Sequence, residues 1–253
     1  MPQALVRRPG RSLSAGLVTH RERVPIDDDL ALRQWHAYVA ALEASGWTIV
    51  EVEPADDCAD AVFVEDALVV FDDLAVVTRP GAASRRREVD GAERAARALG
   101  LDVGRVTEPA TLDGGDVLKI DRTAYVGVGG RTNEAAIAQL DALLSPRGWT
   151  VVAVPVTKVL HLKSAVTALP DGTVVGHPDH VDDPTVFPRF LAVPETSGSH
   201  VVLLGGDRML MAADAPRSAA MFRSMGYAVT EVDVSEFEKL EGCVTCLSVR
   251  HRG

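Results

Sequence analysis

The sequence predicts an α/β propeller: a single domain over residues 1–253, made of about five pseudo-symmetric ββαβ units around a central axis. Two observations lead to this expectation. A β-hairpin followed by a helix recurs about every 40–50 residues, and a repeat of that length is typical of closed repeat architectures. The 253 residues also contain no linker, low-complexity run or shift in composition, so one such domain accounts for the whole chain.

The first unit is predicted to begin with a strand that ends near Arg7 and a loop that contains Leu17, which could be a packing plug or a mobile lid. A helix is predicted over 27–45, because acidic residues at its start suit the helix dipole and apolar residues follow at helical spacing. Gly46 can end this helix, and a strand is expected over 47–52.

The later units repeat this order. Hairpins are predicted over 61–77, 112–128, 163–175 and 205–212, and helices over 88–99, 134–144 and 216–225. The segments at 182–184 and 195–198 are expected to be surface loops, and the segment with the last two cysteines is expected to be a strand. In two units an acidic residue opens the hairpin and an arginine follows it: Asp66 with Arg79, and Asp116 with Arg131.

Composition excludes several classes of function. Hydrophobic residues make up 47% and charged residues 25%, as in ordinary globular proteins. The net charge of −10 argues against nucleic acid as a partner, because such surfaces need positive charge. We find no signal-peptide pattern and no apolar run long enough to span a membrane. The three cysteines favour reduced thiols, so we expect a cytoplasmic protein.

Acidic residues at the starts of units are the first candidates for chemistry. Singly, they are more often turn residues. Asp113 and Asp116, however, flank two glycines that let the backbone approach a partner closely, and Glu65 and Asp66 form a second acidic pair. If the units surround an axis, these carboxylates can converge on one pocket and face a cation.

His161 occupies the start of a hairpin, where other units carry acidic residues, although a single histidine there is more often structural. Cys243 and Cys246 allow three interpretations. A redox pair would need a helix N-terminus in a thioredoxin-like context, and a zinc site would need a second pair of ligands. The third is one thiolate activated by a histidine, as in cysteine hydrolases. Spacing alone leaves all three open.

Six motifs taken together resemble the dimethylarginine dimethylaminohydrolases of the pentein, or amidinotransferase-like, superfamily. They follow the family's order along nearly the whole chain, at 60–66, 78–86, 112–118, 130–133, 161–164 and 245–248. The resemblance implies a five-bladed pentein fold with an axial active site. It also implies hydrolysis of dimethylarginine and monomethylarginine to citrulline plus dimethylamine or methylamine, through a covalent S-alkylthiouronium intermediate.

The resemblance further implies roles for individual residues. Cys246 would be the nucleophile and His161 the general acid and base, and no metal or cofactor would be needed. The implied substrate-binding residues are Asp66 and Asp113 for the guanidinium, Arg85 and Arg131 for the α-carboxylate, Asp60 with the main chain near Leu17 and Leu240 for the α-amine, and Glu65 and Phe63. Some relatives carry glutamate at the position of Asp113, and the shorter side chain here could loosen one contact.

Two alternatives have different functions. An arginine or agmatine deiminase would use similar residues, but arginine deiminases usually carry an inserted helical domain for which 253 residues leave no room. Agmatine has no carboxylate for two arginines to bind. A non-catalytic ligand-binding propeller is disfavoured by the presence of Cys246, His161 and the acidic pairs together. The expected partner is a small arginine-derived molecule, and both a monomer and a homodimer fit the family.

Overall fold

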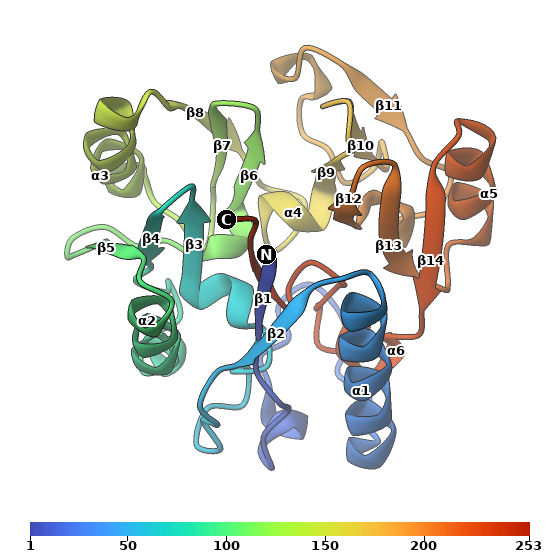
Figure 1. Cartoon of the computed structure of the whole chain (residues 1–253), viewed down its shortest axis with the longest axis horizontal. Coiled ribbons are helices and arrows are strands. Elements are labelled where there is room, and N and C mark those ends of the chain that lie inside the picture. The colour runs from blue at the N-terminus through green and yellow to red at the C-terminus, as the bar shows by residue number, and fades with distance from the viewer.

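Five three-stranded sheets form a ring around one axis in the computed structural model, which describes all residues 1–253 (Figure 1). Each sheet contains one antiparallel pair of strands and a third strand that runs parallel to its neighbour. The predicted five-unit α/β propeller is therefore confirmed. None of its helices combines the length and the apolar character that a membrane span requires.

The strands are short, and in each sheet the strand nearest the axis is the inner one; most residues of these inner strands are buried. The five sheets consist of β15 (Val249–His251), β1 (Gln3–Val6) and β2 (Thr48–Glu51); β3 (Leu68–Phe71), β4 (Leu74–Val77) and β5 (Asp102–Arg105); β6 (Val117–Ile120), β7 (Thr123–Val128) and β8 (Thr150–Pro155); β9 (Val166–Ala168), β10 (Val174–Gly176) and β11 (Phe190–Ala192); and β12 (Val201–Gly205), β13 (Arg208–Ala212) and β14 (Ala228–Val232).

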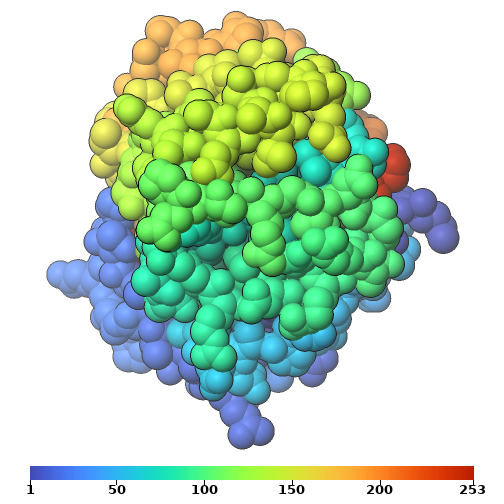
Figure 2. Space-filling view, turned by 90° about the vertical axis from the view of Figure 1, so that its left-hand side faces the viewer, coloured from blue at the N-terminus to red at the C-terminus, as the bar shows by residue number.

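Four longer helices pack on the outside of the ring (Figure 1): α1 (Asp28–Ala44), α2 (Val89–Ala98), α3 (Glu134–Leu144) and α5 (Pro216–Ser224). Of two short helices, α4 (Leu162–Ala165) lies near the axis, and α6 (Ser235–Glu238) packs beside α1. The side chains of Asp27 and Asn133 accept hydrogen bonds from the first turns of α1 and α3, which explains why both helices begin where the sequence predicts. Seen from the side, the units around α2 and α3 cover one face (Figure 2).

The unit of β9–β11 departs from the ββαβ pattern, and the prediction of a strand at the C-terminal cysteines is wrong. The sheet β9–β11 has no outer helix, because residues 177–189 contain three prolines and form only a 3-10 turn at Pro184–Val186, where a loop was expected. The segment around Cys243 and Cys246 is a turn rather than a strand: the Cys246 N–H donates to the Cys243 carbonyl at 3.1 Å. The apolar residues that suggested a strand are buried because the tail fills the core beside α1.

In each sheet the inner strand is preceded by one short turn near the axis, which is either a single turn of helix or a tight turn. Four of these turns are Val64–Ala67, Gly114–Asp116, α4 and Ser197–Ser199, and the fifth is the turn that precedes β15. The first two turns contact each other, and α4 contacts the second. This repeated arrangement brings residues from distant parts of the sequence to one end of the axis.

Candidate active site

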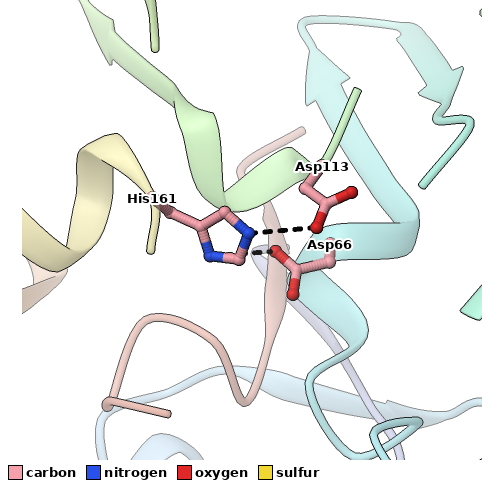
Figure 3. Close-up of side chains that lie close together, drawn as sticks. All are labelled: Asp66, Asp113 and His161. Carbon is pink, nitrogen blue, oxygen red and sulfur yellow. Dashed lines mark hydrogen bonds and ion pairs between the residues drawn. The ribbon is translucent and has the colours of Figure 1, made fainter. Parts of the chain in front are cut away.

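Three buried side chains from three different units meet at this end of the axis (Figure 3). His161, which precedes α4, places Nε2 at 3.0 Å from Asp113 Oδ2 and Nδ1 at 3.9 Å from Asp66 Oδ1. Asp66 belongs to the turn before β3, and Asp113 precedes the turn before β6. The acidic residues singled out in the sequence therefore converge, and they do so around the predicted histidine.

The carboxylates control the charge of His161. Burial alone would lower the pKa of His161, but Asp66, a hydrogen bond with Asp113, and Asp116 together raise it to about 9. Burial raises the pKa of Asp66, yet His161 and Arg85 outweigh that effect and hold it at about 2. At neutral pH the histidine is therefore a cation that can donate a proton, and Asp66 is an anion.

Asp116 positions the histidine without contacting the ring. Its Oδ1 accepts the N–H of Leu162, directly after His161, at 2.9 Å, and its Oδ2 accepts the hydroxyl of Thr132 at 2.6 Å. Burial raises the pKa of Asp116 to about 6, partly offset by His161. The sequence analysis named Asp116 among the acidic candidates but did not predict that it positions His161, because Leu162 and Thr132 lie in two other segments.

The paired glycines allow this close assembly. A Cβ atom on Gly115 would lie 2.7 Å from Asp66 Oδ1 and 2.7 Å from His161 Nδ1, so any side chain there would displace both groups. The N–H of Gly115 donates to Asp66 Oδ1 at 2.9 Å. The glycine pair is thus required by the approach of the histidine and the carboxylate, which the sequence could suggest only in general terms.

Arg85 is almost completely buried and already has several partners. It donates to Asp66 Oδ2 at 2.5 Å, to both oxygens of Glu88, and to the carbonyls of Asp60 and Phe63. In the structure it therefore orients Asp66, and binding of a substrate carboxylate by Arg85 remains a prediction. The sequence reading missed Glu88, whose spacing of three residues from Arg85 was its only signal.

Arg131 has fewer contacts than Arg85. Its Nη1 lies 3.4 Å from Asp113 Oδ2, and no other acceptor is within ion-pair distance. Arg79, which occupies the matching position of the preceding unit in the sequence, instead donates to the Ala110 carbonyl and to the exposed Glu108. The repeat therefore places arginines similarly along the chain, but only Arg131 reaches the site.

Most of the predicted site residues line one small cavity of about 20 Å³. The lining residues are Leu17, Asp60, Phe63, Asp66, Arg85, Arg131, Leu160, His161, Leu240, Glu241, Gly242 and Cys246. Ligand pockets usually hold roughly 300–1,000 Å³, so this cavity is too small for a ligand until its cover moves. That cover is the segment around Leu17, the N–H of which donates to Asp60 Oδ1 at 2.9 Å.

Glu65 and Asp113 are the two predicted binding residues outside this lining. Asp113 lies behind His161 and also accepts the N–H of Gly81 at 2.8 Å. Glu65 pairs with Lys163 at 2.6 Å and lines a larger cavity of about 370 Å³ that contains residues of β6 and β15. The structure therefore does not bring Glu65 into the small cavity, and direct contact of Glu65 with substrate lacks support.

The two cysteines of the tail are free, buried and adjacent. Their Sγ atoms lie 3.3 Å apart, and Cys243 Sγ is also 3.2 Å from the hydroxyl of Thr245. The hydrogen bond with Cys243, burial, and the negative charges of Cys243, Glu65 and Asp66 raise the pKa of Cys246 well above its usual range. A cation in the cavity would oppose these effects and favour the Cys246 thiolate.

The geometry also bears on the metal and redox alternatives. The only group of three potential metal ligands is Asp66, Asp113 and His161, and it includes neither cysteine of the tail. The charges of Arg85 and of protonated His161 already balance those carboxylates. Such a site, with carboxylates beside a thiol and a protonated imidazole, is suited to bind a flat cation and transfer a proton to it.

Comparison with known proteins identifies the family. The family model described as "N,N dimethylarginine dimethylhydrolase, eukaryotic" matches residues 19–176. An N(G),N(G)-dimethylarginine dimethylaminohydrolase of Streptomyces coelicolor is 64% identical over 250 residues, which cover 99% of this chain and 97% of that protein. The chain belongs to the dimethylarginine dimethylaminohydrolase family.

Two solved structures of this family also have the same fold. A dimethylarginine dimethylaminohydrolase in an adduct with S-methyl-L-thiocitrulline superimposes with a TM-score of 0.92 at 32% identity, over 99% of this chain and 100% of that chain. The Pseudomonas aeruginosa dimethylarginine dimethylaminohydrolase, a Cys-to-Ser mutant complexed with citrulline, gives a TM-score of 0.91 at 32% identity, over 98% of both chains. The resemblance drawn from the six motifs, including the pentein fold, is therefore confirmed.

Proposed function

We propose that this protein is a cysteine hydrolase that converts Nω-methylated arginines to citrulline and dimethylamine or methylamine. The observation that carries this function is the small cavity in which Cys246 and His161 lie together with Asp66. The curated name of the Streptomyces relative and the citrulline complex of the Pseudomonas relative describe the same chemistry. We observe no feature that favours an arginine or agmatine deiminase, or a non-catalytic propeller.

Binding of the guanidinium is the first task of the site. The carbon of this group is a poor electrophile because its positive charge is shared by three nitrogens. In our proposal Asp66, which lines the cavity, accepts hydrogen bonds from those nitrogens and fixes the plane of the group, so that its carbon faces Cys246 Sγ. Asp113 lies outside the lining and can join Asp66 only when His161 moves away from it. Since the substrate is itself a cation, its arrival also favours the thiolate form of Cys246.

Proton transfer by His161 then divides the reaction into two halves. The Cys246 thiolate adds to the guanidinium carbon, and protonated His161 gives its proton to the departing methylamine or dimethylamine. A covalent S-alkylthiouronium remains on Cys246. Neutral His161 next removes a proton from water, which attacks the same carbon and releases citrulline and the thiolate. None of these steps uses a metal or a cofactor.

The other end of the substrate is an α-amino acid. We assign its carboxylate to Arg131, which has a single weak partner, with Arg85 as a second candidate. We assign its amine to Asp60 and to the main chain near Leu17 and Leu240, which line the same cavity. Phe63 supplies an apolar wall, and packing of the C-terminal turn against Phe63 supports that role.

Several broader expectations belong to this proposal. A single catalytic domain over residues 1–253 agrees with the closed ring of sheets. Three free cysteines agree with a reducing, cytoplasmic environment. The expected ligand is a small arginine derivative.

Citrulline formation from arginine, monomethylarginine, asymmetric dimethylarginine and agmatine tests the function. We expect turnover of the two methylated arginines and little turnover of the others. Cys246→Ser should reduce turnover by more than about 1,000-fold while circular dichroism remains unchanged, and Cys243→Ser is the matched control that keeps most activity. Unchanged turnover by Cys246→Ser would contradict the mechanism.

A further inference from the structure

The proposed mechanism leaves Cys243 without a task, although it is the nearest sulfur to the nucleophile. Its carbonyl accepts the N–H of Cys246 at 3.1 Å, so the two residues are the first and fourth positions of a β-turn. The Cα atoms of such positions lie within about 7 Å of each other. Disulfides need Cα atoms about 4.4–6.8 Å apart, and the present Sγ atoms are only 3.3 Å apart.

We propose that Cys243 and Cys246 form a reversible oxidation site, at which a peroxide converts the two thiols to a disulfide and thereby inactivates the enzyme. The inference rests on the proposed function, because it takes Cys246 to be the nucleophile. The Cα spacing of such turn positions overlaps that of disulfides, and the sulfur atoms must approach from 3.3 Å to about 2.05 Å.

The oxidation is balanced in two steps. One sulfur, as thiolate, attacks the peroxide; an S–O bond forms, the O–O bond breaks, and a sulfenic acid and one water or alcohol result. The second sulfur then attacks the sulfenic sulfur, so that the S–S bond forms, the S–O bond breaks and water leaves with the remaining proton. Each sulfur loses one electron in total, and the peroxide gains two. A dithiol reverses the change by thiol–disulfide exchange.

Access to the pair passes through the substrate cavity. Cys246 lines that cavity, whereas Cys243 does not, and both cysteines are nearly excluded from solvent. A peroxide must therefore enter where substrate enters, beneath the segment around Leu17. A bound substrate or product consequently protects the pair from oxidation. A ligand in this cavity would not protect a cysteine exposed elsewhere on the surface.

Cys58 provides the contrast within the same chain. It is also free and buried, but it lines a separate cavity with Arg7, Asp57 and Glu88 and forms no hydrogen bond with another sulfur. Cys58 has no second thiol beside it that could convert a sulfenic acid to a disulfide, whereas the sulfur atoms of the C-terminal pair are in contact. Oxidation of the protein should therefore be confined to the C-terminal pair, and replacement of Cys58 should leave it unchanged.

The test combines mass spectrometry with activity on the full chain. The protein is treated with hydrogen peroxide, alkylated under denaturing conditions, and digested. We expect a peptide that contains Cys243 and Cys246, has lost two hydrogens and resists alkylation. Citrulline formation should fall in parallel by at least about tenfold, and dithiothreitol should restore both. Citrulline added before the peroxide should slow the loss several-fold.

Variants separate the disulfide from simple damage. Cys58→Ala should behave like the unmodified chain. Cys243→Ala and Cys243→Ser should retain activity before treatment but lose it irreversibly in excess peroxide, because a sulfenic acid on Cys246 without a resolving thiol proceeds to sulfinic acid. Equal recovery by dithiothreitol in these variants, or absence of the disulfide in the unmodified chain, overturns the proposal. Because the disulfide is mapped by mass, a chain that forms it but hydrolyses no methylarginine would contradict the proposed function alone.

Discussion

His161 is held between two carboxylates that come from different sheets: Asp113 lies 3.0 Å from its Nε2, and Asp66 lies 3.9 Å from its Nδ1. Because each ring nitrogen faces an acceptor, the orientation and the protonated state of the imidazole are determined together. The mechanism needs that state first and the neutral state second, so the strength of the surrounding negative charge matters for both halves of the reaction.

Removal of the negative charge of Asp116, which lies near His161, should shift the pH dependence of activity. In the first half-reaction His161 must be protonated, so activity falls as the pH rises through its pKa of about 9. Asp116→Asn removes a charge that raises this pKa, and the alkaline limb of kcat/KM should therefore move down by roughly one pH unit. The matched control is Asp121→Asn, an exposed acid at the tip of the same hairpin. An unchanged alkaline limb in Asp116→Asn would mean that His161 is not the titrating acid.

Substitution of Arg131 should affect substrates according to their carboxylate. Arg131→Ala should raise KM for dimethylarginine by about 10–100-fold, which corresponds to the loss of one charge-assisted contact. Any turnover of agmatine, which has no carboxylate, should change much less. Arg79→Ala is the natural control, because Arg79 has the matching place in its unit but binds Glu108 and the Ala110 carbonyl. An equal loss with both substrates would remove the assignment.

The hydroxyl of Tyr38 should prove important for the turn that carries the nucleophile. It donates to the Val244 carbonyl at 2.9 Å and is hydrogen-bonded to Ser248 Oγ at 2.7 Å, on either side of Cys246. Tyr38→Phe leaves the buried Val244 carbonyl without this donor, whereas Ser248 Oγ still accepts from Arg250. Urea denaturation should therefore show a loss of about 1–3 kcal/mol in the free energy of unfolding, accompanied by a lower kcat. Tyr227→Phe, in the connection that precedes β14, should change neither quantity. Full stability in Tyr38→Phe would contradict this role.

Glu241 should hold the cover of the cavity closed. Its carboxylate accepts the N–H groups of Thr19 and His20, and its backbone has φ of +62°, a conformation that disfavours residues other than glycine. Glu241→Gln weakens one of these contacts, so KM should rise about three- to tenfold, or about 0.6–1.4 kcal/mol, with little change in the unfolding midpoint. Glu22→Gln, an exposed acid in the same cover, is the control. An unaltered KM would show that Glu241 does not fasten the cover.

Local patterns in the sequence predicted the local structure well. Helix α3 spans Glu134–Leu144 as expected, because an Asn133 cap and an apolar period are both visible within one short window. The hairpins at β3–β4 and β6–β7 were found for the same reason, since their turns lie at Asp72 and Asp121, both with positive φ. The prediction of a strand around Cys243 and Cys246 was wrong, because a turn that is buried in the core also needs a run of apolar residues.

The site depended on contacts that no local pattern contains. The family motifs pointed to His161, Asp66 and Cys246, but they did not show that Arg85 is enclosed by carboxylates and carbonyls, or that Glu65 faces a different cavity. The sulfur contact of Cys243 was equally hidden, because its spacing from Cys246 fits several geometries. These relationships arise from packing between sheets, and only the folded chain determines them.

The ring is closed by strands from opposite ends of the sequence: Leu5 of β1 is paired with Val249 of β15. During synthesis on the ribosome, β1 emerges long before β15, its antiparallel neighbour. Four sheets can form in order while the fifth lacks its inner strand, and the turn with Cys246 precedes that strand directly. The nascent chain therefore remains an open arc without a reactive centre until β15 emerges, and this long-range closure should be a slow step in folding.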